Sequence, residues 1–168
     1  MLTISEATTP EQLDAVRTLM RDYLTWHRQR HHENLRLIDQ YFDEEAFETE
    51  LATLPGKFAP ERGRLLLASY NNEAAGCIAL REIDAHACEM KRMFVDSQFR
   101  GKGIGRGLAQ ALIHEAKTIG YSSMLLDTSI KQVEAQNLYQ SLDFKRIDPY
   151  YEPLPEFKSW LIFMELKL

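Results

Sequence analysis

Apolar and polar residues alternate, or form short unbroken apolar runs, in seven segments of this chain, and both patterns are typical of β-strands. The predicted strands are residues 2–5, 64–70, 74–81, 88–95, 123–127, 144–147 and 159–166. The pair Asn71-Asn72 favours a tight turn, so the second and third strands should form a hairpin. Residues 123–127 are nearly all apolar, which predicts a strand that is covered on both faces.

Four other segments carry apolar residues at the spacing of one face of an α-helix. The first begins at residues 8–11, where Pro10 suits an opening turn, and extends at least to Leu24. The other predicted helices are residues 39–54, 104–119 and 132–142, and Pro55-Gly56 and Gly120 end the first two of these. Residues 148–156 contain three prolines and are predicted as a loop.

The order of these elements is helices, an antiparallel meander, and then strand–helix–strand–helix–strand. This order predicts a mixed α/β sheet with flanking helices, in a single domain that spans residues 1–168. A chain of 168 residues is long enough to bury a sizeable core, and the sequence contains no repeats or low-complexity tracts.

Charge and composition narrow the classes of function. The net charge of −5 disfavours nucleic acid as the main partner, because a phosphate backbone requires a dense basic surface. No segment approaches the roughly 20 apolar residues of a membrane span. The first residues lack the basic start and long apolar run of a signal peptide. We therefore expect a cytoplasmic protein without a membrane partner.

The two cysteines, Cys77 and Cys88, are too few for a disulfide framework. Neither stands in a CxxC pair, and no His-x-x-x-His run is near enough to complete a metal site. We interpret both as small buried thiols in a reducing compartment, and we expect no metal cofactor.

The most informative stretch is residues 100–107, Arg-Gly-Lys-Gly-Ile-Gly-Arg-Gly, between a predicted strand and a predicted helix. Glycine lets the backbone turn sharply and approach a ligand, and the first turn of a helix offers unpaired N–H groups. Together they predict an anion cradle, most often for phosphate. The stretch is not a P-loop, because no Ser or Thr follows Gly-Lys. It is not the dinucleotide fingerprint GxGxxG, because Arg106 or Leu108 stands at the last position.

The pattern Arg-x-x-Gly-x-Gly at residues 100–105 follows a strand that ends in Met-Phe-Val at residues 93–95 and precedes a helix. In this context it resembles the acetyl-CoA motif of the GNAT superfamily of N-acetyltransferases. The run 135–144, Ala-Gln-Asn-Leu-Tyr-Gln-Ser-Leu-Asp-Phe, resembles the second signature of that family, Ala-x-x-Leu-Tyr followed by Gly-Phe. Asp143 stands where the family usually has glycine, and aspartate tolerates positive φ better than most residues.

The resemblance implies a sheet whose two central strands, 88–95 and 123–127, splay apart to hold the pantetheine arm of acetyl-CoA. Backbone groups of the first strand would pair with that arm, and glycine N–H groups would hold the pyrophosphate. Side chains of three cations in the loop could add contacts to phosphate. The implied cofactor-binding residues are Met93, Phe94, Val95, Arg100, Gly101, Lys102, Gly103, Ile104, Gly105, Arg106 and Gln132.

Three of these residues leave questions open. Ile104 is expected to face the core. Gln132 stands where the family often has an asparagine that contacts the cofactor, which is a departure from the family pattern. Arg106 could equally be a solvated cation on the helix.

Tyr139 is the candidate acid, because it aligns with the tyrosine that the family often uses to protonate the leaving thiolate. A phenol is protonated at neutral pH and can donate to a thiolate. The alternative is a packing aromatic residue whose hydroxyl is bonded elsewhere.

Glu89 is the candidate base, at the offset from the glycine motif where some family members carry a base glutamate. Strict alternation along its strand would place it on one face with Lys91, Met93 and Val95. From there it could act directly or through water. The alternative is an ion pair with Lys91 or Arg92.

The acceptor site would be built from the first two helices and from the loop before the last strand. The candidates for its walls are Trp26, His27, Tyr150, Tyr151 and Glu152. For each of them a purely structural role is the favoured interpretation. His31-His32 lies in a polar run and is interpreted as solvated. Asp127-Thr128 is interpreted as a strand end and helix cap, not as a catalytic pair.

We therefore expect an enzyme that moves an acetyl group from acetyl-CoA to a primary amine of a small molecule or peptide, by direct attack in a ternary complex. The alternatives are a CoA or acyl-CoA sensor without turnover, and a partner domain that keeps the fold for packing. The intact glycine motif argues against the partner domain, and Tyr139 with Glu89 argues against the sensor. Dimers are common in the family, and residues 159–168 could reach a partner, so a homodimer is possible. The acceptor itself does not follow from the sequence.

Overall fold

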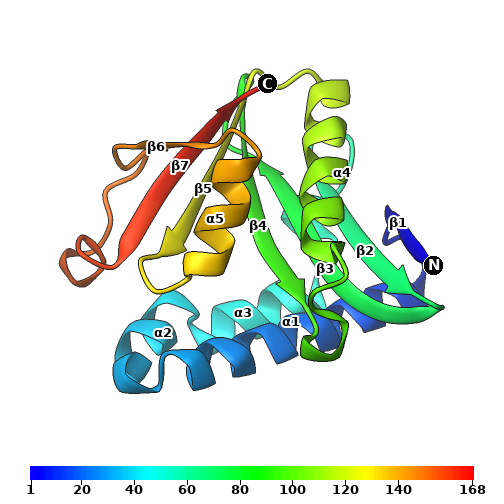
Figure 1. The fold of residues 1–168 in the computed structure, drawn as a ribbon, viewed down its shortest axis with the longest axis horizontal. Helices are drawn as coiled ribbons and strands as arrows, with labels where there is room; N and C mark the ends of the chain where they lie inside the picture. The colour runs from blue at the N-terminus through cyan, green and yellow to red at the C-terminus, as the bar shows by residue number, and fades with distance from the viewer.

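A seven-stranded mixed sheet runs through the computed structural model, which describes all 168 residues (Figure 1). The strands are β1 (Leu2–Glu6), β2 (Arg64–Tyr70), β3 (Glu73–Glu82), β4 (Ala87–Val95), β5 (Ser123–Ser129), β6 (Lys145–Ile147) and β7 (Leu161–Lys167). Their order across the sheet is β1-β2-β3-β4-β5-β7-β6, and only the β4–β5 pair is parallel. Every predicted strand is present with small differences at its ends, so the expected mixed α/β sheet is confirmed.

The β2–β3 hairpin turns at Asn71 and Asn72, as predicted from the sequence. Their φ values of 51° and 69° lie in the left-handed region, which asparagine tolerates better than most residues. Two such residues give a turn whose twist matches that of the flanking strands. The turn sets Tyr70 opposite Glu73 at the end of the hairpin.

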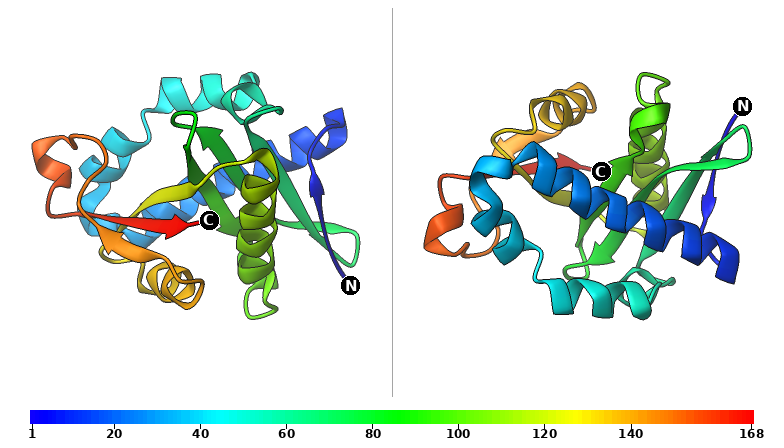
Figure 2. Two further views of the ribbon diagram at one scale, coloured as in Figure 1. Left: turned by 90° about the horizontal axis from the view of Figure 1, so that it is seen from above. Right: turned by 90° about the horizontal axis from the view of Figure 1, so that it is seen from below.

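Helices cover both faces of the sheet (Figure 2). One face carries α1 (Pro10–Arg30), α2 (Leu35–Tyr41) and α3 (Glu44–Ala52), and the other carries α4 (Ile104–Ile119) and α5 (Val133–Ser141). The α4 helix ends at Gly120 in a left-handed conformation with φ 106°, as predicted. None of the helices contains a stretch long and apolar enough to span a membrane.

The prediction of one helix over residues 39–54 is wrong, because the chain forms two helices there. Phe42 has φ −106° and ψ 77°, which is not helical and ends α2. The side chain of Asp43 then accepts a hydrogen bond of 2.9 Å from the backbone N–H of Ala46 and caps a new helix, α3. Phe42, Phe47 and Leu51 are nevertheless buried, as the helical spacing indicated.

The interpretation of His31-His32 as solvated is wrong for His31. The α1 helix continues to Arg30 with His31 as its C-cap, so His27 and His31, four residues apart, lie on the same inner side of the chain. Their exposed fractions are 4% and 1%, whereas His32 is exposed. The two buried rings stack with their centroids 5.4 Å apart.

Two apolar cores, one on each face of the sheet, hold the layers together. The core beneath α4 and α5 includes Ile78, Leu80, Ile104, Leu108, Leu112, Met124 and Phe144. The core beneath α1, α2 and α3 includes Met20, Leu51, Phe58, Leu65 and Phe163. Ile104 faces the core, as expected. Cys88 lies in the first core and Cys77 in the second, and burial raises the pKa of each thiol to about 12, which confirms both as buried thiols.

The two parallel strands β4 and β5 are paired only where they begin. Residues 87–89 of β4 pair with residues 123–125 of β5, and beyond this point the strands diverge (Figure 1). The expected splay of the two central strands is therefore confirmed. The splay leaves one edge of β4 without a strand partner along residues 90–95.

A β-bulge at Arg92 changes which side chains of β4 share a face. Arg92 has a left-handed φ of 58°, and the register between β3 and β4 shifts beside it. Lys91 stays on the face of Glu89, with which it pairs, but Met93 and Val95 pack against the opposite core. The prediction that strict alternation places these four on one face is wrong, because the extra residue reverses the alternation.

Candidate active site

A groove follows the splay of β4 and β5 and consists of three adjoining hollows. The first lies at the glycine loop and is lined by Val95, Phe99, Arg100, Gly101, Gly103, Ile104, Gly105, Arg106 and Leu138. The second lies between β4 and α5 and is lined by Trp26, Arg30, Met93, Phe94, Val95, Arg100, Gly105, Gln132, Glu134, Ala135 and Leu138. The third, called here the reaction pocket, is lined by Tyr23, Tyr41, Glu89, Met90, Lys91, Arg92, Met93, Leu126, Asp127, Thr128, Gln132, Ala135 and Tyr139. Shared residues join each hollow to the next.

The structure brings all of the predicted cofactor-binding residues to this groove except Lys102. Lys102 is exposed, and its Nζ lies 5.1 Å from the centroid of the Tyr70 ring on β2. The negative face of an aromatic ring attracts a cation, which accounts for this direction of the side chain.

The glycine loop has the backbone conformation that its sequence indicates. Gly101 and Gly103 have left-handed φ values of 76° and 77°, a region that is strained for residues with a Cβ atom. Gly103 is the N-cap of α4, so the N–H groups of the first helical turn have no partner inside the helix. Residues of this turn line the first hollow, which therefore suits an anion.

Two arginines of the loop hold the walls of the groove. The Nε of Arg100 donates a 3.2 Å hydrogen bond to the carbonyl oxygen of Val95, and its guanidinium lies 5.2 Å from the centroid of the Trp26 ring. The Nη2 of Arg106 donates a 2.8 Å hydrogen bond to Ser141 Oγ, at the end of α5. Arg106 is exposed, but it links the two helices that border the groove.

The free edge of β4 faces the middle of the groove. The side chains of Met93 and Val95 line this part, whereas the ring of Phe94 is buried in the opposite core, 5.8 Å from that of Tyr23. An extended ligand can add to such an edge as a further strand. Phe94 can take part only through its backbone.

Gln132 stands where the groove enters the reaction pocket. Its Oε1 accepts hydrogen bonds from Thr128 Oγ1 at 3.1 Å and from the Ser129 N–H at 3.2 Å. The side-chain amide therefore organises the β5–α5 connection and has its Nε2 left to donate to a ligand. The interpretation of Thr128 as a helix cap is wrong, because its hydroxyl bonds to this side chain and the α5 N-cap is Gln132.

Tyr139 comes from α5 and lines the reaction pocket. It is 7% exposed, and its ring centroid lies 5.7 Å from that of Phe144. Its hydroxyl forms no hydrogen bond within the chain. Burial raises the pKa of Tyr139, so the phenol stays protonated at neutral pH. The pocket therefore contains a free phenolic donor, in contrast to the alternative of a bonded hydroxyl.

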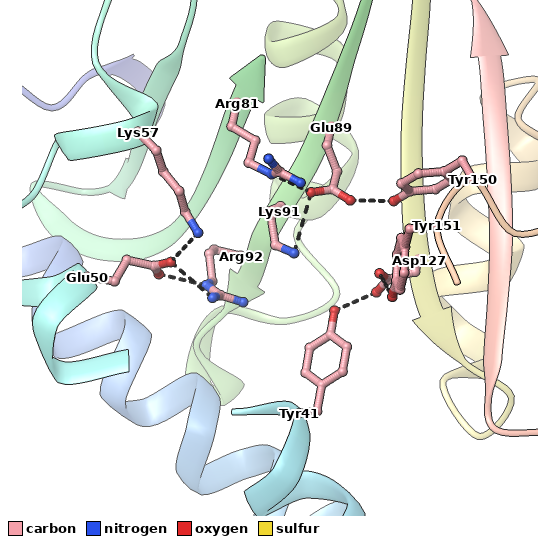
Figure 3. A network of polar contacts seen from close by, with 10 residues as sticks. All are labelled: Tyr41, Glu50, Lys57, Arg81, Glu89, Lys91, Arg92, Asp127, Tyr150 and Tyr151. Atoms are coloured by element: carbon pink, nitrogen blue, oxygen red, sulfur yellow. Dashed lines mark hydrogen bonds and ion pairs between the residues drawn. The ribbon is translucent and has the colours of Figure 1, made fainter. Parts of the chain in front are cut away.

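Glu89 is only 2% exposed and is held by three neighbours (Figure 3). Its Oε1 lies 2.7 Å from Arg81 Nε and 3.5 Å from Lys91 Nζ, and the hydroxyl of Tyr150 donates to its Oε2. Burial by itself would raise the pKa of Glu89, but Lys91, Tyr150 and Arg81 outweigh it and the pKa is lowered. Glu89 is thus ionised at neutral pH. It lines the pocket, and it also forms the pair with Lys91 that was the alternative to a role as base.

Arg92 pairs with Glu50 on α3, not with Glu89. Its Nε and Nη2 lie 2.8 Å and 3.1 Å from the two carboxylate oxygens, and Lys57 Nζ lies 2.8 Å from one of them. The guanidinium also lies over the rings of Phe42 and Phe47, at 5.4 Å and 5.5 Å. This cluster fastens the bulge of β4 to α3 and so helps to fix the splay.

Asp127 is a residue whose place in the site the sequence interpretation missed. It lies within β5, and its carboxylate accepts hydrogen bonds from the hydroxyls of Tyr41 at 2.5 Å and Tyr151 at 2.8 Å. Because β4 diverges from β5, Asp127 lines the same pocket as Tyr139. Its interpretation as a strand end is wrong, because β5 continues to Ser129. The available signal was a carboxylate that directly follows the apolar residues 124–126.

A smaller chamber lies beside the reaction pocket and shares Asp127 and Gln132 with it. His27 and His31 line this chamber, and none of their four ring nitrogens has a partner in the chain; Ser129 Oγ also lacks one. Burial lowers the pKa of His27 to about 3 and lowers that of His31, so both rings are neutral. Buried polar atoms of this kind are usually met by water or a ligand.

The remaining acceptor-site candidates separate into two groups. Tyr150 and Tyr151 reach the two carboxylates of the reaction pocket, and Trp26 lines the middle of the groove. Glu152 lies outside, with its side chain 80% exposed and paired with Lys158 at 2.7 Å. No group of three or more histidine, cysteine, aspartate and glutamate side chains is arranged to hold a metal ion.

A splayed parallel pair, a glycine turn that opens α4 and the groove between them define the fold of an acyltransferase that uses acetyl-CoA. Residues 14–144 match the acetyltransferase (GNAT) family, and the chain belongs to this family. The family and the enzyme class predicted from the sequence are both confirmed.

Three similar proteins show how far the likeness extends. The chain is 32% identical over 170 residues to an uncharacterised N-acetyltransferase of Schizosaccharomyces pombe, covering 99% of this chain and 95% of that protein. It is 32% identical over 120 residues to the N-acetylaspartate synthetase of Danio rerio, covering 70% of this chain and 42% of that protein. A GNAT family acetyltransferase from Elizabethkingia anophelis, solved with acetyl-CoA bound, has a TM-score of 0.61 and 26% identity over 99% of this chain and 98% of that chain.

Proposed function

We propose that this N-acetyltransferase moves the acetyl group of acetyl-CoA to a primary amine of a small molecule or peptide, by direct attack in a ternary complex. The supporting observation is the continuity of the groove, which runs from the glycine loop to the free hydroxyl of Tyr139. The end at the glycine loop suits a pyrophosphate, and the end at the reaction pocket holds the titratable side chains of Glu89 and Tyr139. Such a groove aligns the thioester with the amine, and alignment can supply about 7–11 kcal/mol of the barrier.

In this proposal the two ends of the cofactor are held mainly by backbone. N–H groups of Gly101, Gly103 and Gly105 bind the pyrophosphate, because a helix start favours anions. The pantetheine arm pairs with the free edge of β4 at Met93 and Val95. The arginines of the loop and the free amide of Gln132 add polar contacts along the groove.

The chemistry requires one new bond and two proton transfers. The amine nitrogen attacks the thioester carbonyl carbon, which a backbone N–H at Val95 or a neighbour polarises; the C–N bond forms as the C–S bond breaks. The leaving thiolate takes the proton of the Tyr139 hydroxyl. The proton lost by the amine nitrogen passes to Glu89, directly or through water. The lowered pKa of Glu89 keeps it ionised and able to accept this proton at neutral pH.

A thermal-shift titration with acetyl-CoA, CoA and NADH tests the cofactor, and thiol release with a panel of amines tests the reaction. Aspartate belongs in the panel because of the similarity to N-acetylaspartate synthetase. Stabilisation by the two CoA species alone, with thiol release for one class of amine, is the expected result. Stabilisation without release for any amine would favour a CoA sensor. No stabilisation by either CoA species would overturn the proposed function.

A single domain over residues 1–168, a homodimer and a cytoplasmic location remain predictions. The β7 strand pairs with β5 along residues 161–167 and with β6 at residues 163–165, so β6 and the uncovered ends of β7 form the outer edge of the sheet here. A partner copy would therefore meet β6 at this edge of the sheet, and light scattering of the purified protein tests for the dimer.

A further inference from the structure

Two ion clusters border the reaction pocket, and each contributes one residue to its lining, Glu89 and Arg92 (Figure 3). In the first, Arg81 contacts Glu89 at 2.7 Å, and in the second, Arg92 and Lys57 surround Glu50. Opposite charges at hydrogen-bond distance compensate each other in the first cluster. The second cluster has one cation in excess, but the Lys57 side chain is 46% exposed and its charge is met by water. Two further charged side chains line the same pocket: Lys91, whose one ion-pair contact is at 3.5 Å to Glu89, and Asp127, which has no ion pair.

Lys91 is the one cation lining the pocket that has no anion at hydrogen-bond distance. Its Nζ lies 3.5 Å from a Glu89 oxygen that Arg81 already contacts at 2.7 Å, and it forms no hydrogen bond within the chain. Its side chain is 17% exposed and extends from β4 toward the pocket (Figure 3). An ammonium has three donors, and leaving them unmet in a partly buried site is unfavourable. Lys91 is therefore placed to receive an anionic oxygen from a ligand.

Asp127 is the anion lining the pocket that has no cation as a direct partner, and it lies on β5, across the splay from Lys91. Each of its oxygens accepts one hydrogen bond, from Tyr41 or Tyr151, and it forms no ion pair. A carboxylate offers about four acceptor sites, so acceptor capacity remains beyond the two phenols. Asp127 is therefore placed to receive a cation. A cation with only one long ion-pair contact and an anion with no ion pair thus line one pocket together with Tyr139.

We propose that the acceptor carries a carboxylate as well as its amine, with α-amino acids as the class, and that its ammonium binds at Asp127 and its carboxylate at Lys91. The proposal rests on the proposed function, because it concerns the acceptor of the same reaction. Contact at both ends fixes the amine in the pocket that holds Tyr139. The bound ammonium first gives one proton to solvent water, because only the neutral amine has the lone pair that attacks, and its second proton passes to Glu89 as described above. An amine without the carboxylate leaves the Lys91 ammonium without an anionic partner. A polar site discriminates strongly against a ligand that lacks the group it is built to bind.

The test compares amino acids with the amines left after removal of the α-carboxylate, such as phenylalanine with phenethylamine and alanine with ethylamine. The wild-type protein should show a kcat/KM for the amino acid that is about tenfold or more above that for its amine. Lys91→Met should reduce this ratio by about tenfold or more, and Lys91→Arg should retain most of it. Lys158→Met, on an exposed loop, is the control and should keep the wild-type ratio.

A second substitution separates the two ends of the acceptor. Asp127→Asn keeps an oxygen for a phenol hydrogen bond but removes the charge, so it should raise KM for the amino acid and its amine alike, since both bring an ammonium. Equal use of both members of a pair by the wild-type protein would overturn the proposal. Equal loss for both members in Lys91→Met would also overturn it, because Lys91 would then act only in the structure.

Calorimetric titration of amino acids into the CoA-saturated protein gives a readout that needs no turnover. Binding that weakens in Lys91→Met supports the proposal. If CoA binds and other amines release thiol while amino acids neither bind nor react, the proposal fails and the proposed function stands. If no CoA species binds, the proposed function fails, and the acceptor assignment fails with it.

Discussion

The hydroxyl of Tyr150 donates a hydrogen bond to the buried carboxylate of Glu89, 61 residues earlier in the chain. The next residue, Tyr151, donates to Asp127 in the same way. The loop before β7 thus brings one phenol to each of two carboxylates in the reaction pocket. The predicted loop, whose two tyrosines were candidate walls of the acceptor site, therefore also helps to set the charge state of Glu89.

Replacement of Tyr150 by phenylalanine tests whether Glu89 is the base. The lost hydrogen bond is one of the interactions that lower the pKa of Glu89, so this pKa should rise. A base loses activity below its pKa, so the acidic limb of the kcat/KM profile should move to higher pH. Urea unfolding should show a loss of about 1.5–3 kcal/mol, the usual value for a hydrogen bond to a charged group. An unmoved limb would argue that Glu89 only positions its neighbours.

Replacement of Tyr139 by phenylalanine should lower kcat by about tenfold or more while acetyl-CoA affinity stays nearly constant. Stability should change little, because the hydroxyl has no partner within the chain. Tyr121→Phe is the matched control, since its hydroxyl donates to the Arg62 carbonyl at 2.7 Å, outside the reaction pocket. The control should lose about 1 kcal/mol of stability and keep its turnover. Equal rates for Tyr139→Phe and the wild-type protein would remove Tyr139 from the mechanism.

Replacement of Gly105 by alanine tests the route of the cofactor. Gly105 does not have a left-handed φ, and an added Cβ would lie 3.7 Å from Leu138 and Val95, which line the groove. We expect an intact fold and weaker acetyl-CoA binding, because the new methyl group occupies space that the ligand needs. Isothermal calorimetry measures the affinity, and a wild-type Kd in this variant would place the cofactor elsewhere.

Replacement of Gly103 by alanine should act through the backbone. Its φ is 77° and no atom lies within 4 Å of an added Cβ, so strain is the main effect, with a loss of about 1–2 kcal/mol. Gly120→Ala is the control, with φ 106° and equally open space at the far end of α4. Thermal unfolding should show similar losses for both, but only Gly103→Ala should also weaken CoA binding. Equal affinities would mean that the loop geometry does not matter for the cofactor.

Local pattern was sufficient to predict the strands, the glycine turn, and the turn at Asp143, where the family usually has a glycine. Asp143 has a φ of 71°, so the turn that the family builds with glycine is kept here with aspartate. These features depend on residues that are near one another in sequence, which is why periodicity and motif indicate them.

The features that sequence did not predict depend on contacts between distant segments. The bulge at Arg92 reverses the faces of β4, and its side chain is held by Glu50, 42 residues away. Asp127 reaches the pocket only because β4 diverges from β5 and because Tyr41, 86 residues away, bonds to it. The burial of His31 likewise depends on packing against Trp160, whose ring centroid is 5.1 Å away. Spacing along the chain contains no signal for such contacts.

The two buried histidines predict a loss of stability in mild acid. Burial lowers the pKa of His27 from 6.5 to about 3, so the unfolded chain binds a proton below pH 6.5 that the folded protein does not bind. Above pH 6.5 His27 is neutral in both states and costs the folded protein no stability. As the pH falls from 6.5 toward 3, the free energy of unfolding decreases, because only the unfolded chain takes up the proton. The slope is up to about 1.4 kcal/mol per pH unit for each such group.

His27→Phe should flatten this dependence, because it removes the group that resists protonation. The phenyl ring can keep the contacts with Tyr23 and Phe42, whose ring centroids lie 4.4 Å and 5.2 Å from that of His27. His114→Gln, at an exposed position on α4, is the control and should keep the wild-type slope. Urea unfolding between about pH 5 and pH 8 measures each slope. An unchanged slope in His27→Phe would mean that the folded protein lets His27 take up its proton, and the chamber beside the reaction pocket would then hold a charged ring.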